Sequence, residues 1–565
     1  MRKDVISSGK GEKPMADASF DVVMVGGGTK VLPTACYLTK FGKMSVGIFE
    51  GRAELGEGVY SVQSPAPGFV ANTHSHWHSE RAYYGTMQED IPELVDYGLK
   101  YKPMLLNFGQ YFVEDDSWIG TYHPGIDPTG ERTAKLWERF SKRDAESWLY
   151  YHDKMVKYWI PAILEYINTP VPPPDQPNAF SRLFADPEKT GLKPRWVSMR
   201  PVDVYSDMFE SPEAQTAWTR FVWSAAGGAP DGHGQGILAL IMLAICMMGS
   251  DVIPGGSHAV VHAQQKVIME NGGKVFTNNE VVKVLVENGR ARGIRLADGT
   301  EVEAKRAIVF GLTPFALIKL IGEEFFRDEI RRRINKLERD YMCISWYTWA
   351  LHEHPRYKGA DFHPDIDGMD WMCVGSKDPE DLVVASRRQR LHMWPDVEKP
   401  GAGVISLSNH SWASPELAPP GKSCVLHECY VPPAHSKSPE EWMKFERQHA
   451  EDVLRRWNVI APNMNWDNVI GYNAITPFNL TEENPVAYGK EGNWFQIDAA
   501  PAQFDGCAPI PEWSQTKIPE IEGMYTAGRS WGIGGGSSWE GYRCYRVMAG
   551  DFGLPVPGME RGRPY

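Results

Sequence analysis

The first part of the chain alternates short apolar runs with one segment of helical spacing. Asp21 to Val25 is an apolar run typical of a buried parallel strand, and it ends in three glycines. Over residues 31–41 the apolar positions follow the spacing of a helix, which Gly42 ends. A second apolar run covers Val46 to Phe49. This pattern predicts a strand–helix–strand unit, which is typical of an α/β fold.

Two later segments continue the strand pattern. Residues 274–311 hold three β-rich runs separated by Asn288-Gly289 and Asp298-Gly299, dipeptides that favour type I′ hairpin turns. They predict an antiparallel meander that leads into an apolar strand over 307–310. Met524 to Ala527 is another apolar strand, and we expect a helix after Gly541.

The most apolar run of the sequence covers Ile237 to Met248. Its twelve residues fall short of the roughly 20 that a membrane-spanning helix needs. Because no basic residues flank it, the run favours a buried helix over a monotopic contact with a membrane. A peripheral membrane contact stays the alternative.

Composition and charge narrow the class of protein. The chain has 565 residues, of which 42% are hydrophobic and 23% charged, so it can build a large compact core. Its formal net charge is −13 and we find no long basic run, which argues against a nucleic-acid partner. Residues 1–20 have no apolar core of signal-peptide length, and we expect a flexible tail there.

The cysteines indicate the redox compartment. None of the eight forms a CxxC pair, and they are scattered over the whole length. We therefore expect free thiols in a reducing compartment, the cytoplasm, with membrane association left open.

The turn after the first strand predicts a dinucleotide site. Gly26 permits a tight bend, Gly28 lets the backbone approach a pyrophosphate, and the helix start supplies oriented N–H groups. Glu50 ends the second strand, where a carboxylate can accept hydrogen bonds from a ribose. The third glycine of the fingerprint is replaced by Val31, so we expect the helix to stand slightly further from the sheet.

Three segments together resemble one family. The VVMVGGG turn with Glu50, the meander EVVKVLVENGRARGIRLADGTEV and the late YTAG…GGG segment are similar to phytoene desaturases and retinol saturases, which are FAD-dependent oxidoreductases. The resemblance implies an α/β (α+β overall) fold with a glutathione-reductase-like Rossmann domain and an inserted substrate-binding domain. The FAD domain would cover 21–85, 252–335 and 495–553, the substrate domain 86–251 and 336–494, and a C-terminal tail 554–565.

The resemblance also implies which residues contact FAD. They lie at the first turn, at the end of the second strand, at the start of the meander and in the late glycine segment: Gly26, Gly28, Glu50, Arg52, Val281, Gly528, Gly535 and Gly536.

Candidate catalytic residues come from two segments. In an extended strand over 72–80, His74, His76 and His78 would face one way, but His74 and His78 would then lie ~13 Å apart. That is too far to share one ion, so we predict no metal site and instead a strand beside the flavin, where His74 and His76 are either proton-transfer groups or hydrogen-bonded wall residues.

The second segment is the start of the late helix. Glu540, Tyr542 and Arg543 are candidates for acid–base chemistry or for orienting the substrate. The alternative is that Glu540 and Arg543 pair with each other at i, i+3. A separate acidic cluster, Asp361 to Asp370, lacks the spacing of a calcium loop, and we expect it to be solvated.

The sequence thus predicts an FAD-dependent dehydrogenase or desaturase that transfers hydride from a hydrophobic, isoprenoid or alicyclic substrate to flavin N5. A redox-neutral isomerase or saturase is the alternative enzyme, and a carrier resembling the Rab GDP-dissociation inhibitors is the non-enzyme alternative. We find no second fingerprint for NAD(P)H, so oxygen, a quinone or another protein would accept the electrons. The sequence gives no oligomeric state.

Overall fold

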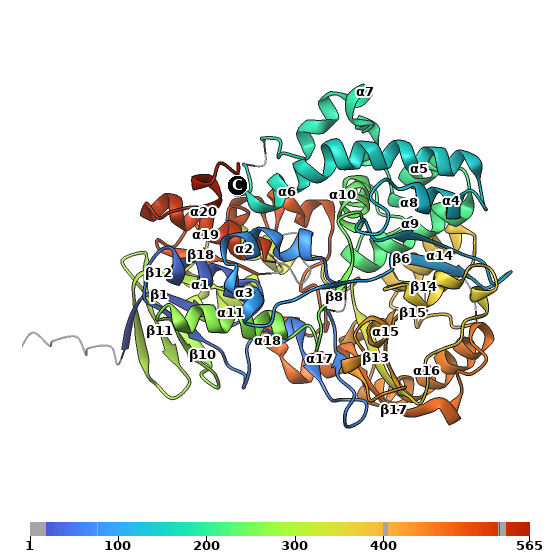
Figure 1. Ribbon diagram of the computed structural model, residues 1–565. Coiled ribbons are helices and arrows are strands. Elements are labelled where there is room, and N and C mark those ends of the chain that lie inside the picture. Colours follow the sequence, from blue (N-terminus) through green and yellow to red (C-terminus); the bar gives the residue numbers. More distant parts are fainter. Residues whose placement is uncertain (1–17, 76, 174, 399–404, 529, 531–537) are drawn as a thin grey trace, which may run out of the picture.

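The computed structural model describes residues 18–75, 77–173, 175–398, 405–528, 530 and 538–565 (Figure 1). Its strands form two large sheets, which lie in the two halves of the molecule, together with two short two-stranded pairs. All eight cysteines are free, as predicted.

The first sheet contains every strand of the predicted strand–helix–strand unit and meander. Its order is β10-β11-β12-β1-β2-β9, and β18 pairs with β12 beside this path. The strands are β1 (Ala18–Val25), β2 (Val46–Phe49), β9 (Lys274–Phe276), β10 (Val281–Glu287), β11 (Arg290–Leu296), β12 (Glu301–Phe310) and β18 (Met524–Thr526). β1 is parallel to both β2 and β12, so the carboxyl ends of these strands meet at one edge.

Strand β12 joins the meander to the parallel sheet. Residues 301–303 pair antiparallel with β11, whereas residues 308–310 pair in parallel with β18. The predicted third run and the predicted strand over 307–310 are therefore one continuous strand. Asn288 and Gly289 both have positive φ, as a type I′ turn requires, but at the second turn only Gly299 does. The type I′ prediction is wrong there, because Leu296 and Thr300 are joined by a longer loop with a left-handed glycine.

Two helices pack closely over the first turn. α1 (Val31–Lys40) follows β1 as predicted, and α19 (Trp539–Phe552) begins two residues before Gly541. A Cβ at Gly541 would lie 2.3 Å from the Lys30 carbonyl oxygen, so glycine permits this helix crossing. A Cβ at Gly311 would likewise lie 2.3 Å from Val31 Cγ2. The space that the fingerprint glycine normally leaves on α1 is thus provided on the neighbouring segment.

The second sheet has the order β17-β13-β16-β15-β14-β6-β7. Its strands are β6 (Leu106–Phe112), β7 (Trp118–Tyr122), β13 (Ile344–Leu351), β14 (Met372–Gly375), β15 (Ile405–Ser408), β16 (Ser423–Tyr430) and β17 (Val469–Ile475). α16 (Pro439–Ile460) contacts His427 and Cys429 of β16, whereas α9 (Pro212–Ala226) stacks Trp223 on Tyr430. Because alternate residues of a strand face opposite sides, these two helices cover opposite faces.

The remaining longer helices surround the two sheets. They are α4 (Glu131–Trp137), α5 (Lys142–Lys154), α6 (Ile160–Asn168), α8 (Pro201–Met208), α10 (Gly236–Cys246), α11 (Ala259–Glu270), α12 (Pro314–Ile321), α13 (Asp328–Asn335), α14 (Pro379–Arg390) and α17 (Pro477–Glu483). α10 is the predicted apolar helix, and it is buried. Among the described helices, none has the length and apolar character to cross a membrane.

The strands of the first sheet come from the segments predicted for the FAD domain, and those of the second from the segments predicted for the substrate domain. The exact domain boundaries stay a prediction.

Candidate functional site

The turn between β1 and α1 is open where a phosphate would lie. Gly26 has φ +87°, and its N–H donates to the carbonyl of Phe49 at 2.9 Å, which ties the turn to the end of β2. A Cβ at Gly28 would meet no atom within 4 Å. The turn therefore leaves free space directly before the start of α1, where backbone N–H groups favour an anion.

Glu50 is held beside this turn by two backbone donors. Its Oε2 accepts from Gly27 N–H at 2.8 Å and its Oε1 from Arg52 N–H at 2.9 Å. Each carboxylate oxygen retains a second lone pair, so Glu50 can still accept hydrogen bonds from ribose hydroxyls. The Glu50 carbonyl accepts from Asn279 N–H at 2.8 Å, which brings the start of β10 with Val281 to the same sheet edge.

These features fit the ADP part of a dinucleotide such as FAD. Of the other residues that the resemblance implies, Gly528 is buried directly after β18, and Arg52 lies 3.8 Å from Glu483 in an ion pair. Gly535 and Gly536 lie outside the described residues.

A buried ion pair joins the starts of α1 and α19. Lys30 Nζ lies 2.9 Å from Glu540 Oε2, and both side chains are almost fully buried. Thr34 Oγ1 also donates to the Gly541 carbonyl at 2.8 Å. Glu540 therefore pairs with Lys30, and the predicted i, i+3 pair with Arg543 is wrong. The reason is tertiary: the close crossing at Gly541 puts a cation from another helix nearer than the one on the same helix.

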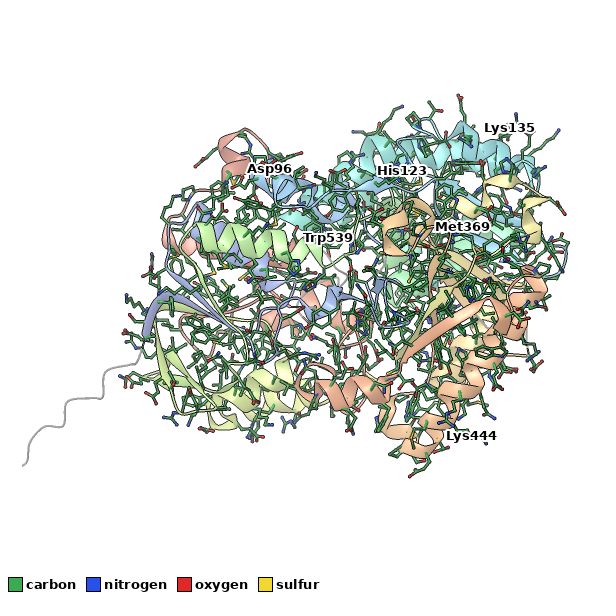
Figure 2. All side chains as sticks on the ribbon, turned by 60° about the horizontal axis from the view of Figure 1, so that its bottom comes forward. Asp96, His123, Lys135, Met369, Lys444 and Trp539 are labelled. Atoms are coloured by element: carbon green, nitrogen blue, oxygen red, sulfur yellow. The ribbon has the colours of Figure 1, made fainter. Side chains whose placement is uncertain are left out.

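The two neighbours of Glu540 point to different helices. The Tyr542 ring lies 4.8 Å from the Tyr37 ring of α1, and burial raises the pKa of the Tyr542 hydroxyl. Arg543 donates to the carbonyl of Tyr166 on α6. Trp539, labelled in Figure 2, starts this helix in the interior of the molecule. A catalytic role for Glu540, Tyr542 and Arg543 stays a prediction.

The histidine segment is not a continuous strand. β4 covers only Ala71–Asn72, and a helical turn, η2, covers Glu80–Tyr84. The extended strand predicted over 72–80 is therefore wrong. Ser79 caps that turn by accepting from Ala82 N–H, and Asp251 accepts from Glu80 N–H, so these polar residues end the extended conformation.

His74 lies in a group of rings that we call the aromatic box: His74, Trp346 and Trp494. The His74 ring is stacked on Trp494 at 4.3 Å and meets Trp346 edge-on at 4.8 Å. Its Nδ1 lies 2.9 Å from Thr73 Oγ1, which fixes the ring. Trp346 Nε1 donates to Glu428 Oε2 at 3.2 Å. His76 lies outside the described residues.

The aromatic box adjoins the late glycine segment. Ser530 Oγ donates to Gln496 Oε1 at 3.1 Å, two residues from Trp494. The box thus combines β13, the segment after β4 and the chain between α17 and β18. Sequence reasoning missed Trp346, Trp494 and Glu428, because aromatic residues are spread through the whole chain and only the fold brings these together.

A buried polar network lies behind β4. His410 Nδ1 contacts Asn72 Nδ2 at 3.0 Å, and His410 Nε2 contacts Asp370 Oδ1 at 2.8 Å. Asp370 also accepts from Ser250 and is fully buried. The prediction of a solvated acidic loop is therefore wrong for Asp370. No sequence signal connects Asn72 with His410, which lies 338 positions later.

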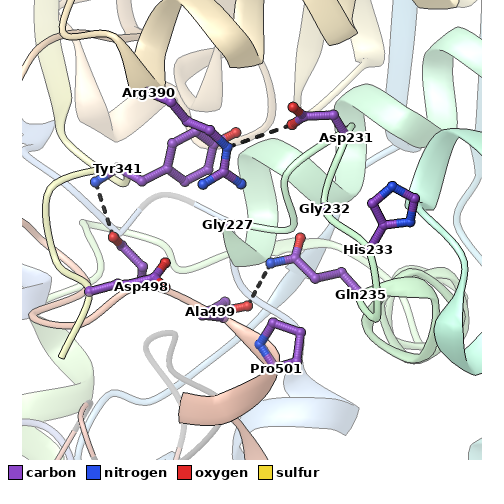
Figure 3. Close-up of a pocket in the computed structure, with 12 residues that line it drawn as sticks. Gly227, Asp231, Gly232, His233, Gln235, Tyr341, Arg390, Asp498, Ala499 and Pro501 are labelled. Carbon is purple, nitrogen blue, oxygen red and sulfur yellow. Dashed lines mark hydrogen bonds and ion pairs between the residues drawn. The ribbon is translucent and has the colours of Figure 1, made fainter. Parts of the chain in front are cut away.

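A separate pocket of about 220 Å³ has a polar lining (Figure 3). Gln235 donates to the Ala499 carbonyl at 2.8 Å, and Asp498 accepts from Tyr341 N–H at 3.0 Å. Burial raises the pKa of Asp498 to about 6. Such a lining does not suit an apolar molecule, so the aromatic box is the better substrate site.

Comparisons with known proteins agree with this geometry. No family model matches the chain. It is 23% identical to one of the limonene dehydrogenase polypeptides of Castellaniella defragrans over 95% of both proteins. It is 28% identical to a 4,4'-diapophytoene desaturase of a Methylomonas species over 36% of this chain and 35% of that protein. The structure of cyclohexylamine oxidase from Brevibacterium oxydans superposes with a TM-score of 0.52 at 13% identity, covering 96% of this chain and 100% of that one.

The protein is a phytoene desaturase-like, FAD-dependent oxidoreductase. The predicted fold class, the predicted cofactor and the prediction of an enzyme are confirmed, and the carrier alternative is not supported.

Proposed function

We propose that this oxidoreductase dehydrogenates a hydrophobic substrate of the isoprenoid or alicyclic class. One observation carries the proposal: a histidine, His74, stands between two tryptophans next to the late glycine segment. Rings of this kind bind apolar molecules by area and shape, and the histidine adds a single group that can exchange a proton. The likeness to the limonene dehydrogenase polypeptide over nearly the whole chain supports the same class.

In this proposal FAD binds along the open turn. Gly26 and Gly28 would face the pyrophosphate, Glu50 the ribose, Val281 the adenine, and Gly528 the ring system. The start of α19 would direct its N–H dipoles towards the flavin. When bound, FAD supplies a two-electron acceptor that takes hydride from carbon.

The protein residues would supply orientation and the proton step. Trp346 and Trp494 would hold the substrate and exclude water, which strengthens the electrostatic interactions in the box. His74 would accept the proton from the carbon next to the one that loses hydride, so that a carbon–carbon double bond forms. Thr73 would fix the ring, and Glu428 would hold the Trp346 indole in place.

The experiment is an anaerobic single turnover with the FAD-loaded protein. We expect limonene or a related cyclic terpene to bleach the flavin and to lose a hydride and a proton, which mass spectrometry of the product detects. An acyclic carotenoid precursor and cyclohexene test the size of the accepted molecule. A product of unchanged mass without bleaching would favour the isomerase, and no reaction with any of these molecules would contradict the proposal.

The electron acceptor is part of the same proposal. Because the sequence has no second nucleotide fingerprint, we expect oxygen, a quinone or another protein to reoxidise the flavin. NADH and NADPH should not bleach the flavin at a useful rate. Rapid anaerobic bleaching by either would contradict this part.

A further inference from the structure

A compact group of metal-type ligands lies away from the aromatic box. His427 and Cys429 belong to β16 and His449 to α16, and all three are buried. We call them the Cys–His cluster. The two Nε2 atoms lie 3.3 Å apart, and Cys429 Sγ lies 3.1 Å from His449 Nε2. All three ligand atoms lie within 4.8 Å of one another.

The strand and the helix produce this convergence in a simple way. His427 and Cys429 are two positions apart, so they leave β16 on the same face. That face is covered by α16, and His449 is one of its buried residues. Glu428, between them, faces the opposite side, where it meets Trp346 of the aromatic box. The Cys–His cluster and the proposed substrate site therefore lie on opposite faces of the sheet.

The spacing matches the edge of a metal tetrahedron. Bonds of about 2.0–2.1 Å to nitrogen and about 2.3 Å to sulfur put two ligand atoms roughly 3.3–3.6 Å apart at a tetrahedral angle. The nitrogen pair meets this value, and the sulfur–nitrogen pair is a few tenths of an ångström closer. We propose that the Cys–His cluster is a binding site for a zinc-type metal ion, held by His427 Nε2, Cys429 Sγ and His449 Nε2.

The protonation states support a ligand role for the histidines. Burial lowers the pKa of His449 to about 3 and that of His427 well below its usual range. Both imidazoles are therefore neutral near pH 7 and offer a lone pair. Burial also raises the pKa of Cys429, so without a metal ion the thiol stays protonated and is no nucleophile.

Hydrogen bonds within the cluster do not account for it fully. His449 Nε2 faces both His427 Nε2 and Cys429 Sγ, but one ring nitrogen makes only one good hydrogen bond. A bound ion would use all three atoms at once. Binding then replaces the S–H bond by a metal–sulfur bond and releases one proton, with no change of oxidation state.

The cluster has a route to the surface. A groove of about 330 Å³ is lined by His449 together with Trp394 and Phe445, whose rings stack at 4.4 Å. The carboxylates of Glu441 and Asp452 line the same groove and attract a cation. Lys444, which also lines it, is labelled on the outside of the molecule in Figure 2. Three protein ligands leave a fourth position for water.

The second ring nitrogens set the expected affinity. Ligating histidines usually donate this N–H to an acceptor, but neither Nδ1 of the cluster has a partner among the described residues. Loss of such a partner typically costs 10–100-fold in affinity. We therefore expect the ion to be removable by chelator and to bind again from solution.

The test uses the FAD-loaded full chain after dialysis against chelator. Equilibrium dialysis with Zn²⁺ should give one ion per chain, and X-ray absorption at the zinc edge should show one sulfur and two histidine nitrogens. Cys429→Ser and His449→Gln should each weaken Zn²⁺ binding at least 10-fold. Cys424→Ser is the matched control, because Cys424 is a buried thiol of the same strand outside the cluster, and it should bind as the wild type does.

Two readouts keep the outcome clear. Flavin content and circular dichroism report whether each variant folds, and a second pair, His427→Gln and Cys373→Ser, replaces any variant that does not. Zinc binding that survives Cys429→Ser, zinc without a sulfur ligand, or no binding by the wild type would each overturn the proposal.

Discussion

The buried pair between Lys30 and Glu540 allows the sharpest prediction about the fold. The charged atoms lie 2.9 Å apart, and the two side chains are 4% and 1% exposed. Removing one partner of a buried pair leaves an uncompensated charge and typically costs about 3–5 kcal/mol. Glu540→Gln and Lys30→Met should each lower the free energy of unfolding by that amount. Glu540 Oε1 has no hydrogen-bond partner among the described residues, so no second contact compensates for the loss of Lys30.

The double variant separates charge burial from packing. Lys30→Met combined with Glu540→Gln leaves no buried charge, and well-packed neutral residues often match a buried pair in stability. We therefore expect the double variant to recover most of the loss, with a coupling free energy of about 3 kcal/mol.

Urea unfolding followed by circular dichroism measures these differences as shifts of the midpoint at constant slope. Lys319→Met on the exposed face of α12 is the control, and it should change the midpoint little. If the losses of the two single variants simply add in the double variant, the pair does not act as described.

Three shorter predictions follow from other sites. His74→Ala should lower turnover about 10²–10⁴-fold at unchanged flavin content, and turnover at the wild-type level would leave His74 a structural role. Asp498, whose pKa burial raises from 3.8 to about 6, favours folding while it is protonated; relative to Asp498→Asn, the wild type should lose about 3 kcal/mol as the pH rises from 4 to 6, and a constant difference would contradict this. Gly311→Ala should destabilise the protein by roughly 1–3 kcal/mol because its Cβ meets Val31, and adding Val31→Ala should restore the melting temperature unless the contact has no effect.

The local parts of the fold could be predicted from sequence. β1, α1, β2 and the meander are written in neighbouring residues, as apolar runs, helical spacing and glycine-containing turns. Glu50 could be placed at the turn because the strand–helix–strand unit fixes the distance between them. These are features in which sequence neighbours determine the structure.

The predictions that failed depended on residues far apart in the chain. Arg543 was the nearest cation to Glu540 in sequence, but the α1–α19 crossing brings Lys30 closer in space. The segment 72–80 alternates like a strand, yet Asp251 and the cap at Ser79 end it. The same reason hid the Cys–His cluster: His449 is 20 residues from Cys429 and meets it only because α16 packs on β16.

The central claim is that the turn after β1 and Glu50 hold FAD, and the flavin dissociation constant tests it most directly. Glu50→Ala removes the acceptor for the ribose hydroxyls, and hydrogen bonds to a charged group contribute about 1.5–3 kcal/mol. The account predicts that the dissociation constant of FAD rises roughly 10- to 150-fold in Glu50→Ala. Glu54→Ala, which removes a more exposed carboxylate four residues later, should leave it unchanged. Equal flavin affinity in the wild type and Glu50→Ala would contradict the account.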